Sequence, residues 1–130
     1  MAHEILQPPG WPRPKGYANG IAASGRTIFV AGQIGWDENC QWQTDDLAGQ
    51  VRQTLANTLA VLKAGGAGPE HVVRMTWYIT DKADYLRQAP KIGEVYRELM
   101  GKNYPAMAMV EVRALMEDRA KVEIETTAVV

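Results

Sequence analysis

Two runs near the end of the chain alternate in side-chain character with a period of two, which is typical of β-strands. The first run spans residues 104–112 and the second spans residues 121–129, and both are rich in β-branched or other apolar positions. The polar segment 113–120 that separates them has the length of a hairpin loop. We therefore expect the two strands to pair antiparallel.

The same alternation assigns side chains to sheet faces, because successive Cβ atoms of a strand point to opposite sides. On the first strand Met107 and Met109 share a face, and on the second Glu123 and Glu125 do. We expect these methionines and carboxylates to lie together on one face. Ionised side chains are rarely buried without partners, so such a face is unusual for a plain core and is a candidate site.

A helix is predicted in the middle of the chain. Residues 44–46, Thr-Asp-Asp, supply a capping residue and two acids at the expected start, where they meet unpaired N–H groups. Apolar residues then recur at steps of three and four, and Gly65-Gly66 ends the pattern. The stripe consists of Leu47, Val51, Leu55, Leu59 and Leu62.

A further strand and a second helix follow. Residues 73–80 alternate between apolar and polar side chains and predict a strand. Helical periodicity returns after Asp81, but Pro90 lacks the N–H that a helix interior needs. We therefore expect a short first turn and a main helix from about Ala89 to Met100.

The N-terminal third is predicted to be an arm followed by two strands. Four prolines within residues 8–14 exclude a helix there and predict a surface arm or lid. Residues 17–23 and 27–32 are the expected strands, joined by a turn in which Gly25 has a positive φ. Two helices, each with one apolar stripe, suit one face of a mixed sheet, which is an α+β architecture.

Length and composition limit the possible functions. A chain of 130 residues with 46% hydrophobic and 22% charged residues predicts a single globular domain over 1–130. Its formal charge of -1 gives no basic field for nucleic acid. Residues 1–6 lack a secretory pattern, no apolar run approaches the roughly 20 residues of a membrane span, and Cys40 is alone. We expect a cytoplasmic protein that binds neither nucleic acid nor membrane.

Several catalytic chemistries have weak support. Ser24 is the only serine and falls in a predicted turn. His3 and His71 with one cysteine do not form a zinc-ligand pattern, so no metal is expected. The glycines of residues 65–68 follow a helix instead of opening one, so they do not predict a phosphate loop. Cys40 has no cationic neighbour in sequence that would activate it.

Pro-Ala-x-x-x-Val-Glu-Val at 105–112, followed by Lys-Val-Glu-Ile-Glu at 121–125, resembles the signature of the Rid family, the YjgF-like enamine/imine deaminases. Residues 16–17, 29–34 and 50–57 extend the resemblance over nearly the whole chain. The resemblance implies a chorismate mutase-like fold and a homotrimer with clefts between subunits. It also implies a small imine or enamine as ligand, and no cofactor.

The resemblance also implies roles for five residues. Glu123 matches the family glutamate that holds the attacking water, Tyr17 the tyrosine that closes over the ligand, and Gly32 a backbone position beside the ligand. Met107 stands where deaminating members carry a substrate-binding arginine, and Met109 where many carry a cysteine. Methionine can neither carry charge nor donate a hydrogen bond, so these two positions suggest an atypical, more apolar substrate.

Two functions therefore stay open. The retained Glu123 and Tyr17 favour hydrolysis of an imine or enamine, whereas Met107 favours a non-catalytic trimer that binds a small metabolite. From the residues alone, Glu123 and Glu125 are more simply charges that pair with Lys121, Arg113 or Arg119 at a sheet edge. The methionines are equally well explained as core filler. A ribonuclease is disfavoured by the acidic balance and by the lack of a His/Lys pattern.

Overall fold

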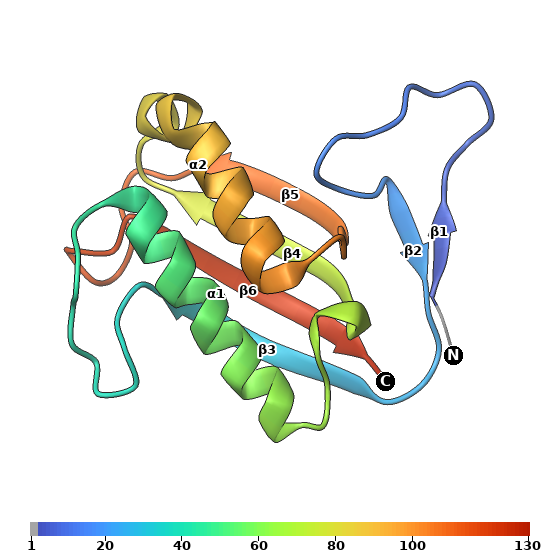
Figure 1. Ribbon diagram of the computed structural model, residues 1–130, viewed down its shortest axis with the longest axis horizontal. Helices are drawn as coiled ribbons and strands as arrows, with labels where there is room; N and C mark the ends of the chain where they lie inside the picture. Colours follow the sequence, from blue (N-terminus) through green and yellow to red (C-terminus); the bar gives the residue numbers. More distant parts are fainter. Residues whose placement is uncertain (1–2) are drawn as a thin grey trace.

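The computed structural model describes residues 3–130 as a mixed sheet with two helices on one face, beside a small N-terminal sheet (Figure 1). This confirms the predicted α+β fold. The helices are α1 (Leu47–Ala64) and α2 (Lys82–Met100). The strands are β1 (Glu4–Leu6), β2 (Gly20–Ala22), β3 (Thr27–Ile34), β4 (Val72–Ile79), β5 (Ala106–Glu111) and β6 (Val122–Val129), and a short 3-10 turn, η1 (Pro69–His71), precedes β4.

The main sheet has the strand order β3-β6-β4-β5. β5 runs parallel to β4, because α2 carries the chain back across the sheet between them. β6 runs antiparallel to β4 and to β3. The predicted hairpin of the last two strands is therefore wrong, since β4 lies between them. The connection over residues 112–121 is long enough to pass one strand.

This topology also corrects the predicted faces. Met107 lies opposite Met75 and Met109 opposite Trp77, and both of these β4 residues are buried beneath the helices. Glu123 lies opposite Tyr78, which points to the other face because side chains alternate along β4. The methionines are thus on the helix-covered face, and Glu123 and Glu125 are on the open face.

α1 confirms the predicted helix. Asp46 is its N-cap, and the side chain accepts a hydrogen bond of 3.1 Å from the N–H of Gly49. Gly65 caps the other end, and Gly66 adopts a positive φ of 78°. Val51, Leu55 and Leu62 of the stripe are fully buried against the sheet. Local sequence therefore defines this element completely.

α2 is one continuous helix, and the predicted break near Pro90 is wrong. Proline removes one N–H from the helix and leaves the carbonyl of Leu86 without its usual donor. Both residues lie on the exposed side of α2, where that carbonyl can bind water. The missing bond therefore costs stability without ending the helix. Ile92, Val95 and Met100 on the other side are buried in the core.

The N-terminal strands pair with each other and not with β3. β1 and β2 form a separate antiparallel sheet, with Ile5 opposite Ile21. The expected pairing of the strands around Gly25 is therefore wrong, although Gly25 has the predicted positive φ, 140°. The arm then reaches β5, because the N–H of Ala18 donates to the carbonyl of Pro105 at 2.9 Å. No helix within residues 3–130 has the length and apolar character of a bilayer span.

Candidate functional site

The carboxylate of Glu123 lies directly over Gly32 on the open face of the sheet. Gly32 belongs to the edge strand β3, in a segment where the pairing with β6 is irregular between Val30 and Gln33. A Cβ atom at Gly32 would overlap Oε2 of Glu123 and lie 2.8 Å from its Cδ. Only a residue without a side chain leaves this space free. The carboxylate can therefore reach over the edge strand.

Glu125, two residues further along β6, is held differently. Its carboxylate accepts a hydrogen bond of 2.7 Å from the hydroxyl of Tyr78. This hydrogen bond, together with burial and the charges of Glu125 and Glu123, raises the pKa of Tyr78 above its ordinary value, while Arg74 opposes the shift. Tyr78 therefore stays a neutral donor, and Glu125 is engaged by it.

Apolar side chains are exposed on this same open face. Phe29 on β3 is 79% exposed, and Val110 on β5 is 45% exposed. Phe29 borders a shallow groove of about 260 Å³ that Arg74 and Glu125 also line. The two side chains lie on opposite edge strands, so only a partner that covers the whole open face would bury both.

Met107 and Met109 line a different space, a cavity of about 200 Å³ between α2 and strands β4 and β5. Both side chains are partly buried and pack against the hydrophobic core. The remaining lining residues are Gly16, Trp77, Tyr85, Ala89, Ile92, Gly93, Tyr96, Arg97 and Tyr104. The cavity is thus mostly aromatic and sulfur-lined, with one guanidinium.

The aromatic wall of this cavity is firmly packed. The rings of Tyr96 and Tyr104 stack with centroids 5.4 Å apart and planes 13° apart, and Trp77 lies 6.4 Å from Tyr96. The hydroxyl of Tyr96 donates to the carbonyl of Asn103 at 2.5 Å. Burial raises the pKa of Tyr96 well above its ordinary value, so the phenol is neutral. The wall is therefore apolar and already ordered.

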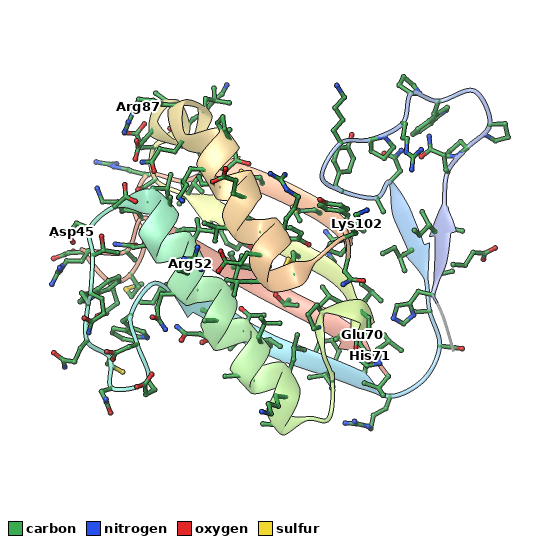
Figure 2. All side chains as sticks on the ribbon, in the orientation of Figure 1. Asp45, Arg52, Glu70, His71, Arg87 and Lys102 are labelled. Atoms are coloured by element: carbon green, nitrogen blue, oxygen red, sulfur yellow. The ribbon has the colours of Figure 1, made fainter. Side chains whose placement is uncertain are left out.

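Tyr17 belongs to a neighbouring depression beneath the N-terminal arm. This depression has a volume of about 620 Å³ and includes Trp11, Arg13 and Lys102, and Tyr17 itself is 42% exposed. Figure 2 labels Lys102 near the end of α2, on the side of the molecule where the arm lies. The depression shares Gly16 and Tyr104 with the methionine cavity, so the two spaces are adjacent.

The five predicted site residues therefore form two groups within one chain. Gly32 and Glu123 are together at the β3 edge, while Met107 and Met109 are at the β5 edge with Tyr17 beside them. Strands β6 and β4 separate the two edges in the sheet order. The expected single cluster of Met107 and Glu123 is wrong for one chain, because the two side chains are on opposite faces.

Sequence analysis did not identify most of the cavity. Ala89 and Gly93 are one helical turn apart on α2, and their small side chains leave room opposite the methionines. A glycine inside a helix costs stability, so Gly93 could have indicated from the sequence alone that this part of the helix has an unusual packing environment. Tyr85, Tyr96 and Tyr104 could not be assigned to the cavity without knowing which strands α2 covers.

Several other reactive or charged side chains lie away from both sets of candidate site residues. Arg52 of α1 forms an ion pair with Glu98 of α2, and Figure 2 labels Arg52 between the two helices. This pair lowers the pKa of Glu98 through its hydrogen bond with Arg52. Cys40 is exposed in the loop before α1. Within residues 3–130, His, Cys, Asp and Glu side chains do not gather in threes as potential metal ligands.

The family described as Endoribonuclease L-PSP matches residues 12–130 of the chain. A RutC family protein of Pyrococcus horikoshii is 34% identical over 126 residues, covering 96% of each protein. The 2-iminobutanoate/2-iminopropanoate deaminase of Homo sapiens is 33% identical over 105 residues, which cover 80% of this chain and 73% of the human protein. These matches show that the chain belongs to the Rid family.

Solved structures agree with this assignment. YyfB from Yersinia pestis, a protein of unknown function of the conserved Rid family, superposes with a TM-score of 0.86 at 30% identity and covers all of both chains. Rv2704 from Mycobacterium tuberculosis, a member of the YjgF/YER057c/UK114 family, gives a TM-score of 0.66 at 35% identity over 88% of this chain and 87% of that one. The fold is thus the chorismate mutase-like fold of this family.

Proposed function

We propose that the protein hydrolyses the C=N bond of a small imine or enamine, with Glu123 as the catalytic residue. The observation that carries the proposal is the carboxylate of Glu123 lying over Gly32 at the edge of the sheet. The deaminases of 2-iminobutanoate and 2-iminopropanoate among its relatives support the same reaction class.

The reaction needs one group that moves protons in both directions. Water adds to the carbon of the protonated imine while Glu123 takes one proton from that water, which gives a neutral carbinolamine. Glu123 then gives this proton to nitrogen, the C–N bond breaks as ammonia leaves, and the carbinolamine hydroxyl passes its proton to Glu123 and on to solvent as the C=O bond forms. A positioned carboxylate suits both steps, because general acid-base catalysis contributes typically about 100-fold or more.

A second copy of the chain would complete the site. β3 and β5 are the two edge strands of the sheet, and each has one side without a strand neighbour within the described chain. If β5 of one subunit adjoins β3 of the next, the edge that carries Met107 and Tyr17 lies beside the Gly32 edge of the other chain, over which the Glu123 carboxylate reaches. We propose a homotrimer with three such clefts, in which closure leaves no free edge.

Within this cleft, Tyr17 covers the ligand, Gly32 lets it approach the backbone, and Met107 and Met109 contact its apolar part. Methionine at position 107 removes the charge that would bind a substrate carboxylate beside β5. We therefore place the chain in a Rid subgroup that lacks the substrate-binding arginine and acts on an atypical imine.

A non-catalytic role as a trimer that binds a small metabolite is the second candidate. It is favoured by the methionine and aromatic lining of the cavity, which supplies binding surface without a carboxylate or an imidazole. This role predicts ligand binding with no release of ammonia.

The test is a coupled assay for ammonia release, with imines generated in place by an amino-acid oxidase. The proposed enzyme accelerates hydrolysis over the buffer rate, and Glu123→Gln reduces that acceleration by about 100-fold or more. Glu125→Gln is the matched control and retains activity, because its carboxylate is engaged by Tyr78. Full activity in Glu123→Gln contradicts the catalytic role.

A further inference from the structure

The cavity of Met107 and Met109 indicates what kind of ligand the cleft takes. We propose that this cavity binds the aromatic ring of a carboxylate-bearing ligand, such as the imine of an aromatic 2-amino acid, and that Arg97 at its rim holds the carboxylate. The inference rests on the proposed function for the reaction, but the ligand class is argued from the cavity alone.

Volume is the first argument. The cavity measures about 200 Å³. An apolar cavity of about 150 Å³ is large enough to hold benzene. One six-membered ring with a short linker therefore fits between α2 and β5. A ligand as small as 2-iminopropanoate would leave most of the space unfilled and forfeit the dispersion contacts.

The lining favours an aromatic group over an aliphatic one. Trp77, Tyr85 and the stacked pair Tyr96 and Tyr104 present ring surfaces or edges. Offset or edge-to-face contacts between aromatic rings are worth about 0.5–1.5 kcal/mol beyond their buried area. The sulfur atoms of Met107 and Met109 add contacts that are themselves favourable with aromatic rings. A planar ring therefore gains from every side of the cavity.

Small residues of α2 create this space. Ala89 and Gly93 line the cavity one helical turn apart, and Gly93 lies inside the helix. Glycine in a helix interior costs roughly 0.5–1 kcal/mol relative to alanine. A leucine at this position would suit the helix better, but its side chain would take up space at the cavity wall beside Arg97. The structure thus keeps a cavity at a cost to helix stability.

Arg97 supplies a positive charge at the rim. One Nη of Arg97 lies 3.3 Å from the place where a Cβ of Gly93 would be, so the guanidinium folds back toward the cavity. Within the part of the chain that the structure describes, no carboxylate lies at ion-pair distance from it, unlike Arg52 and Arg87. The guanidinium is available for a ligand carboxylate, which it can bind through two donors.

The test uses 3-phenylpropionate, an unreactive acid, as the probe. Calorimetry measures its affinity, and spectra of the protein labelled with ¹³C in the methionine methyl groups locate it. The expected result is ring-current shifts at Met107 and Met109, with no shift at Met116, which is 90% exposed and serves as the internal control. Butyrate is expected to bind at least tenfold more weakly because it lacks the ring.

Two variants separate the cavity from the charge. Gly93→Leu fills the cavity and is expected to weaken both 3-phenylpropionate and the uncharged 3-phenylpropanol at least tenfold while raising the thermal midpoint, so misfolding cannot explain the loss. The loss of the alcohol isolates the cavity from Arg97, whose Nη lies 3.3 Å from the new Cβ. Arg97→Met is expected to weaken 3-phenylpropionate about tenfold and leave 3-phenylpropanol, which has no charge, unchanged. Arg87→Met on the same helix is the matched control and should bind normally, because Arg87 pairs with Asp84.

The outcomes distinguish this inference from the proposed reaction. Binding that is unaffected by Gly93→Leu, or shifts absent from Met107 and Met109, would overturn the ligand assignment whatever the enzyme activity. The role of Arg97 would be overturned if the Arg97→Met variant bound both the acid and the alcohol as tightly as the unaltered protein does. Cavity binding as expected without imine hydrolysis would support the ligand class and contradict the proposed catalysis.

Discussion

The carboxylate of Glu123 lies so close over Gly32 that a single methyl group at position 32 would displace it. In Gly32→Ala the new Cβ overlaps Oε2 of Glu123, and the carboxylate must rotate away. We expect a loss of activity of at least tenfold with little change in unfolding free energy, because the displaced group is the end of a flexible side chain. Steady-state kinetics and thermal unfolding measure the two effects.

A matched glycine provides the control. At Gly68 a Cβ would meet Oε1 of Glu70 at 2.8 Å, in the η1 turn away from the candidate site. Gly68→Ala imposes a similar crowding on a carboxylate, and we expect its activity to be normal. Equal activity in both variants would show that the position of the Glu123 carboxylate does not matter for turnover.

We expect Met107 to determine how the proposed cleft treats small substrates. Met107→Arg introduces a guanidinium into the cavity, where a charge-assisted pair with a substrate carboxylate is worth about 1.5–3 kcal/mol. We expect the unaltered protein to accelerate hydrolysis of 2-iminopropanoate only slightly and the variant to do so at least tenfold more. The same variant should bind 3-phenylpropionate more weakly, because the arginine occupies the space of the ring.

The contrary results are equally informative. If the unaltered protein hydrolyses 2-iminopropanoate as fast as a relative with the arginine, then Arg97 or another cation binds the carboxylate of this small substrate as well as an arginine at position 107 would. If Met107→Arg does not fold, position 107 belongs to a sealed core. The cavity beside Met107 leads us to expect a folded variant, which circular dichroism can verify.

At the scale of elements, α2 tolerates a proline that weakens it. Pro90→Ala restores one N–H in the middle of the helix, opposite the carbonyl of Leu86, and removes the ring from that carbonyl. We expect the free energy of unfolding to rise by about 1–3 kcal/mol, since proline is about 3 kcal/mol less favourable than alanine in a helix interior. Urea denaturation measures the change.

Pro69 is the control for this effect. It occupies the first turn of η1, where the missing N–H would have no helical partner. Pro69→Ala is expected to leave stability unchanged or lower it slightly. A gain at Pro69 as large as that at Pro90 would mean that the missing helical N–H is not the cause, because removing a proline raises the entropy of the unfolded chain and by itself lowers stability.

Elements were predictable where the determining contacts are local. Asp46, the apolar stripe and Gly65 define α1 from neighbouring residues, and the structure confirms it. Strand partners are not local. The alternation of residues 104–112 is the same whether β5 pairs with β6 or with β4, and only the crossover through α2 decides between them. Pairing β5 with β6 would put Met107 on the same sheet face as Glu123, whereas in the structure the two side chains are on opposite faces.

For the whole molecule, the candidate site depends on contacts that no local pattern contains. The resemblance to the Rid family named Gly32 and Glu123, and the structure brings these two together. It does not bring them to Met107, because the two groups lie at opposite edges of one sheet. The cavity escaped prediction for the same reason, since its walls come from α2, two strands and the N-terminal arm.

Assembly is therefore the central prediction at this scale. Phe29 and Val110 are exposed on the open face, and the half-sites at β3 and β5 are separate within one chain. A closed ring of three copies buries these side chains and joins the half-sites. We expect light scattering at micromolar concentration to give three times the chain mass of 14.4 kDa.

Phe29→Asp tests whether this face is the interface, because three carboxylates would then meet on the covered side. We expect the variant to dissociate and to lose activity while its circular dichroism stays that of a folded α+β protein. Leu86→Asp, which alters a residue 59% exposed on the outer side of α2, is the matched control and should remain trimeric. If the unaltered protein is a monomer, the site must lie within one chain. If Phe29→Asp remains an active trimer, the interface must lie elsewhere.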